Sequence, residues 1–260
     1  MTAAHSSVVF LMYHELALPG RSPVESEPGY VRYVLDASEF ESQMRAIRAM
    51  GFRGISVGEA LRFPSRSVAI TFDDGCETDL LSAAPVLKQL GFGATFYVVA
   101  GWVGKSGFLS PSQLRELHGA GLEIGCHSMT HAYLSDLDEA GWHREITCAK
   151  DMLEQMLGNP IEHFSCPGGR SDARAVVVAK KAGFRTIATS LPRAHRPSGD
   201  LLSLGRVAIK RGMSLEAFQK VCQGRELWKI ELSGSVRDSA KRVLGNRTYD
   251  RMRALLLGKE

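Results

Sequence analysis

Short apolar runs alternate with helical patterns along most of this 260-residue chain. Seven runs have the length and composition of buried strands, at residues 8–13, 67–72, 94–100, 122–127, 163–167, 186–189 and 206–210. Helical stretches lie at residues 38–50, 79–91, 110–121, 139–158 and 171–183, and each ends at or just before a glycine. Strand–helix–strand alternation at this spacing predicts a parallel sheet covered by helices. With seven such runs, we expect an irregular (β/α)7-type barrel rather than an open sheet.

Two local features refine this picture. The connection at residues 15–37 is long and polar, and long loops of a barrel often border its site. The helix at residues 38–50 is expected to begin with a capping box, because Ser38 is followed three residues later by Glu41.

No linker separates a second domain, so we expect one catalytic domain over residues 1–225 and a basic helical C-terminal extension over residues 226–260. A basic amphipathic helix either lies on an anionic membrane surface or packs its apolar stripe on its own domain. Both readings stay open for this extension. Its basic residues are Arg237, Lys241, Arg242, Arg247, Arg251, Arg253 and Lys259, and its apolar residues include Val243, Leu244, Met252, Leu255, Leu256 and Leu257.

Composition narrows the class of protein. A formal net charge of +4 is modest for this length and does not predict nucleic-acid binding, which usually needs dense basic clustering. The apolar run at residues 8–13 is shorter than the core of a secretory signal, and no stretch approaches the length of a membrane span. The five cysteines, Cys76, Cys126, Cys148, Cys166 and Cys222, show no CxxC spacing, which favours free thiols and a reducing compartment. We therefore expect a cytoplasmic protein.

Polar side chains with metal-binding chemistry follow two of the predicted strands. Asp73 and Asp74 end the run at 67–72 and precede Gly75, while His127 and His131 follow the run at 122–127. A spacing of four places two imidazoles on one side of a helical turn. Alone, the first pair is usually a solvated turn and the second two unrelated surface histidines. Together, at two strand exits of one barrel, they indicate a hydrolytic metal site with positions open for water.

These motifs also match a known pattern. TFDDG at residues 71–75, followed by HSMTH at residues 127–131, resembles the polysaccharide deacetylase family, also described as NodB homology or carbohydrate esterase family 4. The similarity extends over roughly residues 6–212. The strings LMYHE (11–15), ATFYVV (94–99) and GLEIGCHSMTH (121–131) look most like the branch of poly-N-acetylglucosamine deacetylases.

The resemblance implies a role for each motif residue. Asp74, His127 and His131 would hold a divalent metal, zinc in many members, and Asp73 would be the general base. The cation would polarise the amide carbonyl and acidify the attacking water, while the base takes the proton of that water. The cation and a backbone N–H, such as that of Cys76, would stabilise the oxyanion.

The chain departs from the family pattern at its third motif, usually Arg-x-Pro-aromatic-Gly, whose arginine orients the catalytic aspartate. Here Pro167 and Gly169 match, but Ser165 stands in place of the arginine and Arg170 follows the motif. Arg170 either reaches the base from the loop or lies on the surface. What supports Asp73 is therefore open.

The family's general acid is a histidine of a Leu-x-His motif, which is not recognisable near residues 186–210. In the poly-N-acetylglucosamine branch this element is displaced to the N-terminus, where His14 ends the first strand. His14 is either the general acid or a histidine that caps a strand, and His195, on a loop, is a weaker alternative. Trp102 and Phe108 either stack on a sugar ring or pack within their own loop.

The leading hypothesis is a metal-dependent hydrolase that removes N-acetyl groups from an amino-sugar glycan or sugar precursor. A lipid-linked or nucleotide-linked precursor would suit a cytoplasmic enzyme with peripheral membrane contact through its basic extension. One alternative is a deformylase or O-deacetylase acting on a related small sugar conjugate. Another is a degenerate domain that binds glycan without turnover, favoured by Ser165 and the missing C-terminal histidine but opposed by the intact DDG and HxxxH motifs.

Overall fold

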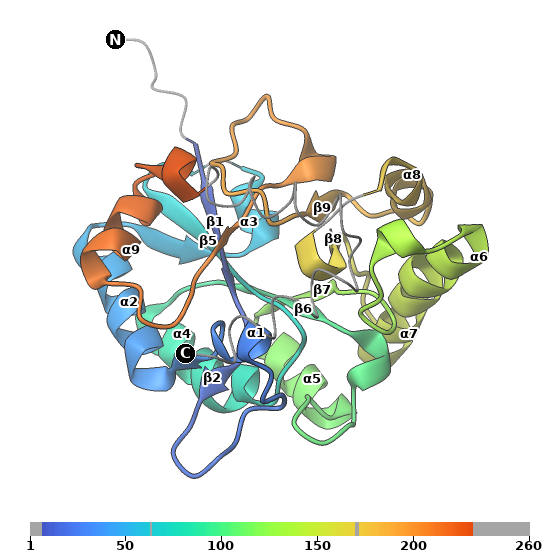
Figure 1. Cartoon of the computed structure of the whole chain (residues 1–260), viewed down its shortest axis with the longest axis horizontal. Helices are drawn as coiled ribbons and strands as arrows, with labels where there is room; N and C mark the ends of the chain where they lie inside the picture. The colour runs from blue at the N-terminus through green and yellow to red at the C-terminus, as the bar shows by residue number, and fades with distance from the viewer. Residues whose placement is uncertain (1–6, 63, 170–171, 231–260) are drawn as a thin grey trace.

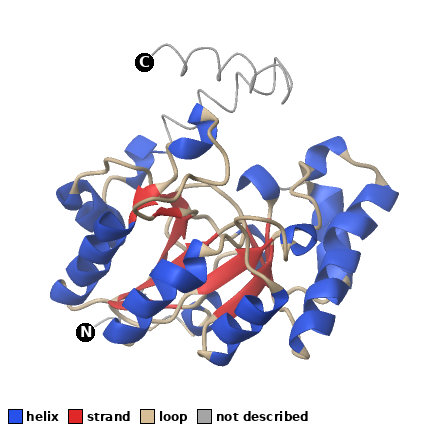
Figure 2. Cartoon of the chain, turned by 90° about the horizontal axis from the view of Figure 1, so that it is seen from below, coloured by secondary structure: helices blue, strands red, loops and turns tan. Residues whose placement is uncertain are grey.

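Parallel strands form a curved sheet, and helices ring these strands (Figures 1 and 2). The computed structural model of the chain describes residues 7–62, 64–169 and 172–230. The strands of this sheet are β1 (Val9–Tyr13), β4 (Arg53–Ile55), β5 (Ser67–Phe72), β6 (Thr95–Val98), β7 (Glu123–Cys126), β8 (His163–Ser165), β9 (Thr186–Ala188) and β10 (Val207–Ala208). Their order is β10-β1-β5-β6-β7-β8-β9, with β4 beside β5, and every pair is parallel. The predicted irregular (β/α)7-type barrel is confirmed.

All five predicted helical stretches form helices. The helices are α1 (Pro28–Val31), α2 (Ala37–Ala49), α3 (Val57–Ala60), α4 (Ala84–Leu90), α5 (Pro111–Gly119), α6 (Glu139–Trp142), α7 (Ala149–Leu157), α8 (Ala173–Lys181) and α9 (Leu215–Cys222), of which α1, α3 and α9 were not predicted. Two π-helical segments extend the predicted helices: Asp79–Ala83 leads into α4, and His143–Cys148 joins α6 to α7. The second of these segments contributes to the site described below.

Alternation along the strands separates two apolar clusters. In β1 and β5, Leu11 and Ile70 belong to the larger cluster, in which the strands pack against the helices. Their neighbours Phe10 and Ala69 belong to a smaller cluster inside the barrel, with Tyr97 of β6. Because successive side chains on a strand point to opposite faces, this alternation decides which residues beyond Ala69 turn into the barrel.

Two local predictions were incomplete or wrong. β4 was not predicted, because its three residues, Arg53 to Ile55, do not form an apolar run. Its middle residue is Gly54, which lets the strand pack closely: a Cβ atom there would lie 2.5 Å from Ile70 Cδ1. The capping box at Ser38 does not form, since α2 begins directly after Asp36, the last residue of β3, and Glu41 pairs with Arg45 instead.

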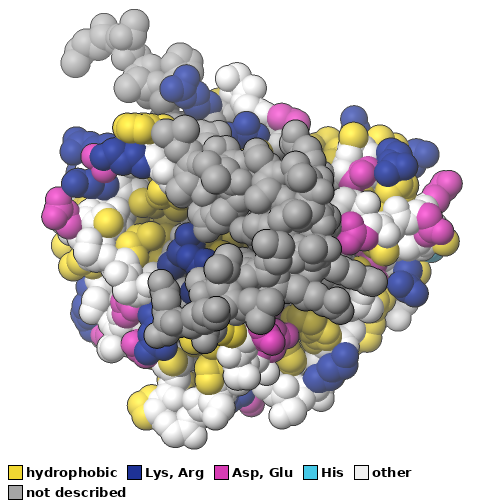
Figure 3. Space-filling view, viewed as in Figure 1, with side chains coloured by type: hydrophobic (Ala, Val, Ile, Leu, Met, Phe, Trp, Pro, Cys, Tyr) yellow, Lys and Arg dark blue, Asp and Glu magenta, His cyan; other side chains and the backbone are white. Residues whose placement is uncertain are grey.

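The long connection at residues 15–37 is partly ordered into regular structure. It contains β2 (Leu16–Ala17) and β3 (Leu35–Asp36), which pair in parallel, as well as α1. The predicted extension at residues 226–260 lies outside the described residues from residue 231 onward, so its helices and the domain boundary stay predictions. Within the described part of the chain, no helix combines the length and apolarity needed to cross a membrane. Figure 3 shows basic and acidic side chains interspersed around the rim of one face.

Candidate active site

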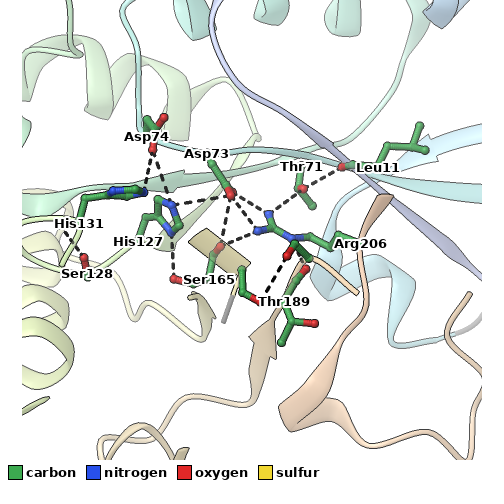
Figure 4. A network of polar contacts seen from close by, with 12 residues as sticks. Leu11, Thr71, Asp73, Asp74, His127, Ser128, His131, Ser165, Thr189 and Arg206 are labelled. Carbon is green, nitrogen blue, oxygen red and sulfur yellow. Dashed lines mark hydrogen bonds and ion pairs between the residues drawn. The ribbon is translucent and has the colours of Figure 1, made fainter. Parts of the chain in front are cut away.

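The carboxyl ends of β1, β5, β7 and β8 meet at one end of the barrel, and the predicted site residues lie there. Asp73 and Asp74 follow β5, His127 follows β7, and His14 follows β1. Asp73 continues the alternation of Ala69 and Thr71 into the barrel. Asp74 breaks that alternation, because its backbone adopts a left-handed conformation with φ 80°. The two adjacent carboxylates can therefore serve the same site (Figure 4).

Asp74, His127 and His131 form a candidate metal site. The Nε2 atoms of His127 and His131 lie 3.6 Å and 3.7 Å from Asp74 Oδ1, and one ligand atom from each residue lies within 4.8 Å of the others. That carboxylate oxygen is buried and has no hydrogen-bond partner among the described residues. An unpaired buried carboxylate oxygen is costly unless a cation or a donor meets it. One carboxylate and two imidazoles are also ligands that zinc accepts, so these residues fit a divalent ion.

Both histidines are held in the form that binds metal. Nδ1 of His127 lies 2.9 Å from the carbonyl oxygen of Ser165, so a proton on Nδ1 donates to that carbonyl and leaves the Nε2 lone pair free. Burial lowers the pKa of His127 to about 3 and also lowers the pKa of His131. Burial, together with the neighbouring charge of Asp73, raises the pKa of Asp74 to about 6.

Asp73 is bound by an arginine that the sequence motifs did not point to. Arg206, one residue before β10, is fully buried, and its Nη1 and Nη2 donate to Asp73 Oδ1 and Oδ2 over 2.6 and 2.8 Å. Nη2 also donates to Ser165 Oγ over 2.7 Å. Ser165 occupies the motif position where an arginine was expected, and it contacts the arginine that binds Asp73 instead. Figure 4 shows this network.

Further contacts fix Arg206 in the barrel. Nη1 donates to Thr71 Oγ1 and Nε donates to the carbonyl oxygen of Thr189, while the guanidinium lies 5.2 Å from the centre of the Tyr97 ring. Burial alone would raise the pKa of Asp73, but the charge and hydrogen bonds of Arg206 hold that pKa well below its ordinary value. Asp73 is therefore ionised at neutral pH.

His14 follows β1 at the same end of the barrel as both aspartates. Its charge acts to lower the pKa of Asp73 and of Asp74, and its ring lies 4.9 Å from the ring of Tyr33 in the 15–37 connection. Its Nδ1 is buried without a hydrogen-bond partner among the described residues. This position, at the end of β1, suits a group that reaches a substrate bound at the site.

His195 does not reach the site. It forms an antiparallel bridge with Val8, at the amino end of β1, whereas His14 lies at the carboxyl end of the same strand. The alternative assignment of His195 as the general acid is therefore wrong. The bridge to Val8 puts His195 at the amino end of β1, opposite the end of the barrel that carries the site.

The remaining predicted residues lie as follows. The ring of half-buried Trp102 is 5.5 Å from the ring of His131 and 4.8 Å from that of Phe108, so Trp102 borders the candidate metal site. Pro167 is buried after β8, and Gly169 has φ 69° with no room for a Cβ atom, which would lie 2.1 Å from Ser190 Oγ. Arg170 lies outside the described residues. The support for Asp73 that was sought there comes from Arg206.

Comparison with known proteins agrees with this site. The family model described as polysaccharide deacetylase matches residues 60–187, which include both aspartates and both histidines. YxkH of Bacillus subtilis, whose name is that of a polysaccharide deacetylase, is 27% identical over 224 residues, covering 84% of this chain and 76% of that protein. The poly-beta-1,6-N-acetyl-D-glucosamine N-deacetylase of Staphylococcus aureus strain MRSA252 is 27% identical over 197 residues, covering 68% of each chain.

Solved structures show the same fold. IcaB from Ammonifex degensii aligns with a TM-score of 0.70 at 27% identity, over 84% of this chain and 97% of that one. The deacetylase PplD of Streptococcus pyogenes aligns with a TM-score of 0.75 at 24% identity, over 83% of this chain and 98% of that one.

Proposed function

We propose that this chain, which carries a domain of the polysaccharide deacetylase family, is a metal-dependent hydrolase that removes N-acetyl groups from an amino-sugar glycan. One observation carries the proposal. The triad of Asp74, His127 and His131, with ligand atoms within 4.8 Å of one another, lies beside Asp73, a second buried carboxylate that the triad does not use. Amide hydrolysis needs both functions, a site for a cation and a separate base.

A divalent cation in the triad supplies Lewis acidity to the amide carbonyl and to the attacking water. Asp73 then acts as the base. Its Oδ2 lies 3.7 Å from Nε2 of His127, which places the base next to the triad. A carboxylate has about four lone-pair sites, so the two hydrogen bonds from Arg206 and the weaker one from Ser165 leave Asp73 able to accept a proton.

The other residues complete the reaction in assigned roles. His14 donates a proton to the departing amine, since histidine is a common general acid and this residue ends β1 at the same end of the barrel as both aspartates. The backbone N–H of Cys76, two residues after Asp74, is the proposed donor to the developing oxyanion. Trp102, against His131, offers an aromatic face to a sugar ring.

Arg206 bears on the alternative of a domain that only binds glycan. That alternative rested partly on the loss of the family arginine at Ser165. The buried guanidinium of Arg206, from the residue before β10, binds Asp73 instead, so this argument for a degenerate site no longer holds.

The substrate is proposed on a different basis. Similarity to a poly-beta-1,6-N-acetyl-D-glucosamine N-deacetylase supports a substrate that contains N-acetylglucosamine. All five cysteines are unpaired, which supports a reducing compartment. We therefore propose a cytoplasmic enzyme whose substrate is a lipid-linked or nucleotide-linked sugar precursor, with the basic residues after 236 near the membrane. Zinc is the proposed ion.

The test is acetate release by zinc-loaded protein from three substrates: β-1,6-linked N-acetylglucosamine oligomers, chitooligomers and a nucleotide-linked N-acetyl sugar. We expect release from at least one, lost by roughly 10²–10⁴-fold in Asp73→Asn. Asp36→Asn is the matched control, because the Asp36 side chain is half exposed, makes no cap hydrogen bond to α2 and pairs with the surface residue Arg211 at 3.4 Å. Formate release or ester cleavage alone would favour the deformylase or O-deacetylase alternative. No turnover of any substrate would contradict the proposal.

A further inference from the structure

A fully buried carboxylate lies behind the loop that carries the two histidine ligands. Glu145 belongs to the π-helical segment His143–Cys148 and is 0% exposed. It accepts hydrogen bonds from the backbone N–H of Met129 (3.1 Å), the backbone N–H of Thr130 (2.7 Å) and the hydroxyl of Thr130 (2.8 Å). All three donors lie between His127 and His131. The carboxylate therefore binds the segment that joins the two ligands.

This segment has an unfavourable backbone conformation. Ser128 and His131 both have left-handed backbones, with φ 69° and 63°. Such a conformation is unfavourable for a residue other than glycine and persists only where its surroundings hold it. The hydroxyl of Ser128 accepts from the N–H of His131 over 2.9 Å, which closes the turn from inside (Figure 4).

The opposite side of the segment is held by the residues that follow β6. The N–H of Ala100 donates to the carbonyl oxygen of Ser128 over 3.0 Å, and that of Gly101 donates to the carbonyl oxygen of Met129 over 2.9 Å. A Cβ atom at Gly101 would lie 2.5 Å from this carbonyl oxygen, so the approach requires glycine. The carbonyl groups of the segment thus face residues 100–101, and its N–H groups face Glu145.

We propose that Glu145 is a positioning residue, which fixes His131 relative to Asp74 and thereby sets the affinity of the triad for its cation. Replacing the carboxylate with the amide of glutamine leaves one acceptor oxygen for these three donors and removes the charge that strengthens their hydrogen bonds. The segment would then relax from the conformation that brings His131 Nε2 to 3.7 Å from Asp74 Oδ1. The role of the neighbouring Arg144 is peripheral, since its side chain is 64% exposed and its Nε lies 3.6 Å from Glu145 Oε1. The inference rests on the proposed function, in that the triad binds a metal.

The test measures Co²⁺ and Zn²⁺ binding to Glu145→Gln. Residues that support metal ligands typically contribute 10–100-fold in affinity, and Glu145 acts through the backbone, so we expect about a tenfold weaker dissociation constant by chelator competition. The visible absorption spectrum of bound Co²⁺ should also change in intensity, because the ligand geometry changes.

Glu154→Gln is the matched control. Glu154 lies on α7 of the same helical stretch and accepts hydrogen bonds from the N–H of Ile161 over 2.8 Å and from Lys150, but neither donor belongs to the segment between the two histidines. We expect it to lower thermal stability while metal affinity stays within twofold of the unmodified protein. Equal affinity in Glu145→Gln and the unmodified protein would overturn the inference.

A second variant keeps the test decisive if Glu145→Gln does not fold. Thr130→Val preserves the shape of the side chain and the charge of Glu145 but removes one of its three donors. We expect a smaller loss, roughly threefold in affinity; no loss would overturn the inference. Failure of the unmodified protein to bind either ion would contradict the proposed function itself, whereas tight binding that neither variant weakens would contradict only the role of Glu145.

Discussion

Arg206→Met tests the buried pair on which the proposed base depends. Arg206 and Asp73 are 0% and 2% exposed and are joined by two hydrogen bonds of 2.6 and 2.8 Å. Methionine fills much of the arginine volume without its charge, so the main effect is an uncompensated carboxylate inside the barrel. Breaking a buried ion pair in this way typically costs about 3–5 kcal/mol, and we expect a loss of unfolding free energy in this range.

A double-mutant cycle with Asp73→Asn isolates the interaction. Without the Asp73 carboxylate, Arg206 contributes little to stability. The losses of unfolding free energy in the two single variants should therefore add up to more than the loss in the double variant. We expect a coupling energy of about 2–3 kcal/mol, at the upper end for residues in contact. The assay is urea unfolding of chelator-treated protein, followed by circular dichroism, so that metal loss does not contribute.

The control is Arg185→Met, which breaks an exposed ion pair with Glu162 of 2.7 Å. Its side chains are 56% and 45% exposed, so we expect a change within about 0.5 kcal/mol. A coupling energy below about 0.5 kcal/mol for Arg206 and Asp73 would refute the reasoning. It would mean that the arginine does not hold the base.

Three further predictions follow from the same geometry. His14→Gln should lower kcat by roughly 10²–10⁴-fold while Co²⁺ affinity stays within twofold, and an unchanged kcat in steady-state assays would exclude it as the general acid. Gly101→Ala should weaken Co²⁺ binding and lower the melting temperature, because its Cβ would lie 2.5 Å from the carbonyl oxygen of Met129. Gly119→Ala, with nothing within 4 Å of the added atom, should do neither. Burial would raise the pKa of Glu123, but hydrogen bonds hold it below its ordinary value, so this carboxylate stabilises the fold above about pH 4.3 and less as pH falls. The stability difference between the unmodified protein and Glu123→Gln in urea unfolding should therefore shrink from pH 7 to pH 3; a constant difference would contradict it.

The metal triad could be predicted because its residues belong to local motifs. Asp74 lies next to a glycine at a strand exit, and His127 and His131 are four residues apart, so short stretches of sequence carry most of their geometry. The structure shows how a spacing of four residues brings the two imidazoles together. The two histidines do not lie on a helix; a turn with two left-handed residues, Ser128 and His131, brings them together.

Arg206 could not be predicted in the same way, because it is 133 residues from Asp73 in the chain. Its place depends on the register of β10 beside β1, where Val207 is opposite Leu11, and on the alternation that turns the preceding side chain into the barrel. The one sequence signal is that Arg206 directly precedes three apolar residues, at 207–209. A charge at that point of a buried strand needs a partner, but the sequence does not say which one.

The error at His195 has a topological cause. The sequence placed this histidine on a loop without showing which end of the barrel the loop occupies. In a parallel barrel the loop after a strand lies at the carboxyl end, and the backbone just before a strand lies at the amino end. The bridge between His195 and Val8 places His195 at the amino end.

The most direct test of the account is to titrate metal-free protein with Zn²⁺ while measuring acetate release from an N-acetylglucosamine oligomer. If Asp74, His127 and His131 hold the ion that activates the reaction, activity should rise from near zero to a plateau at one equivalent, and His127→Gln should abolish the rise. Full activity of the metal-free protein, or an unaltered titration in His127→Gln, would contradict the account.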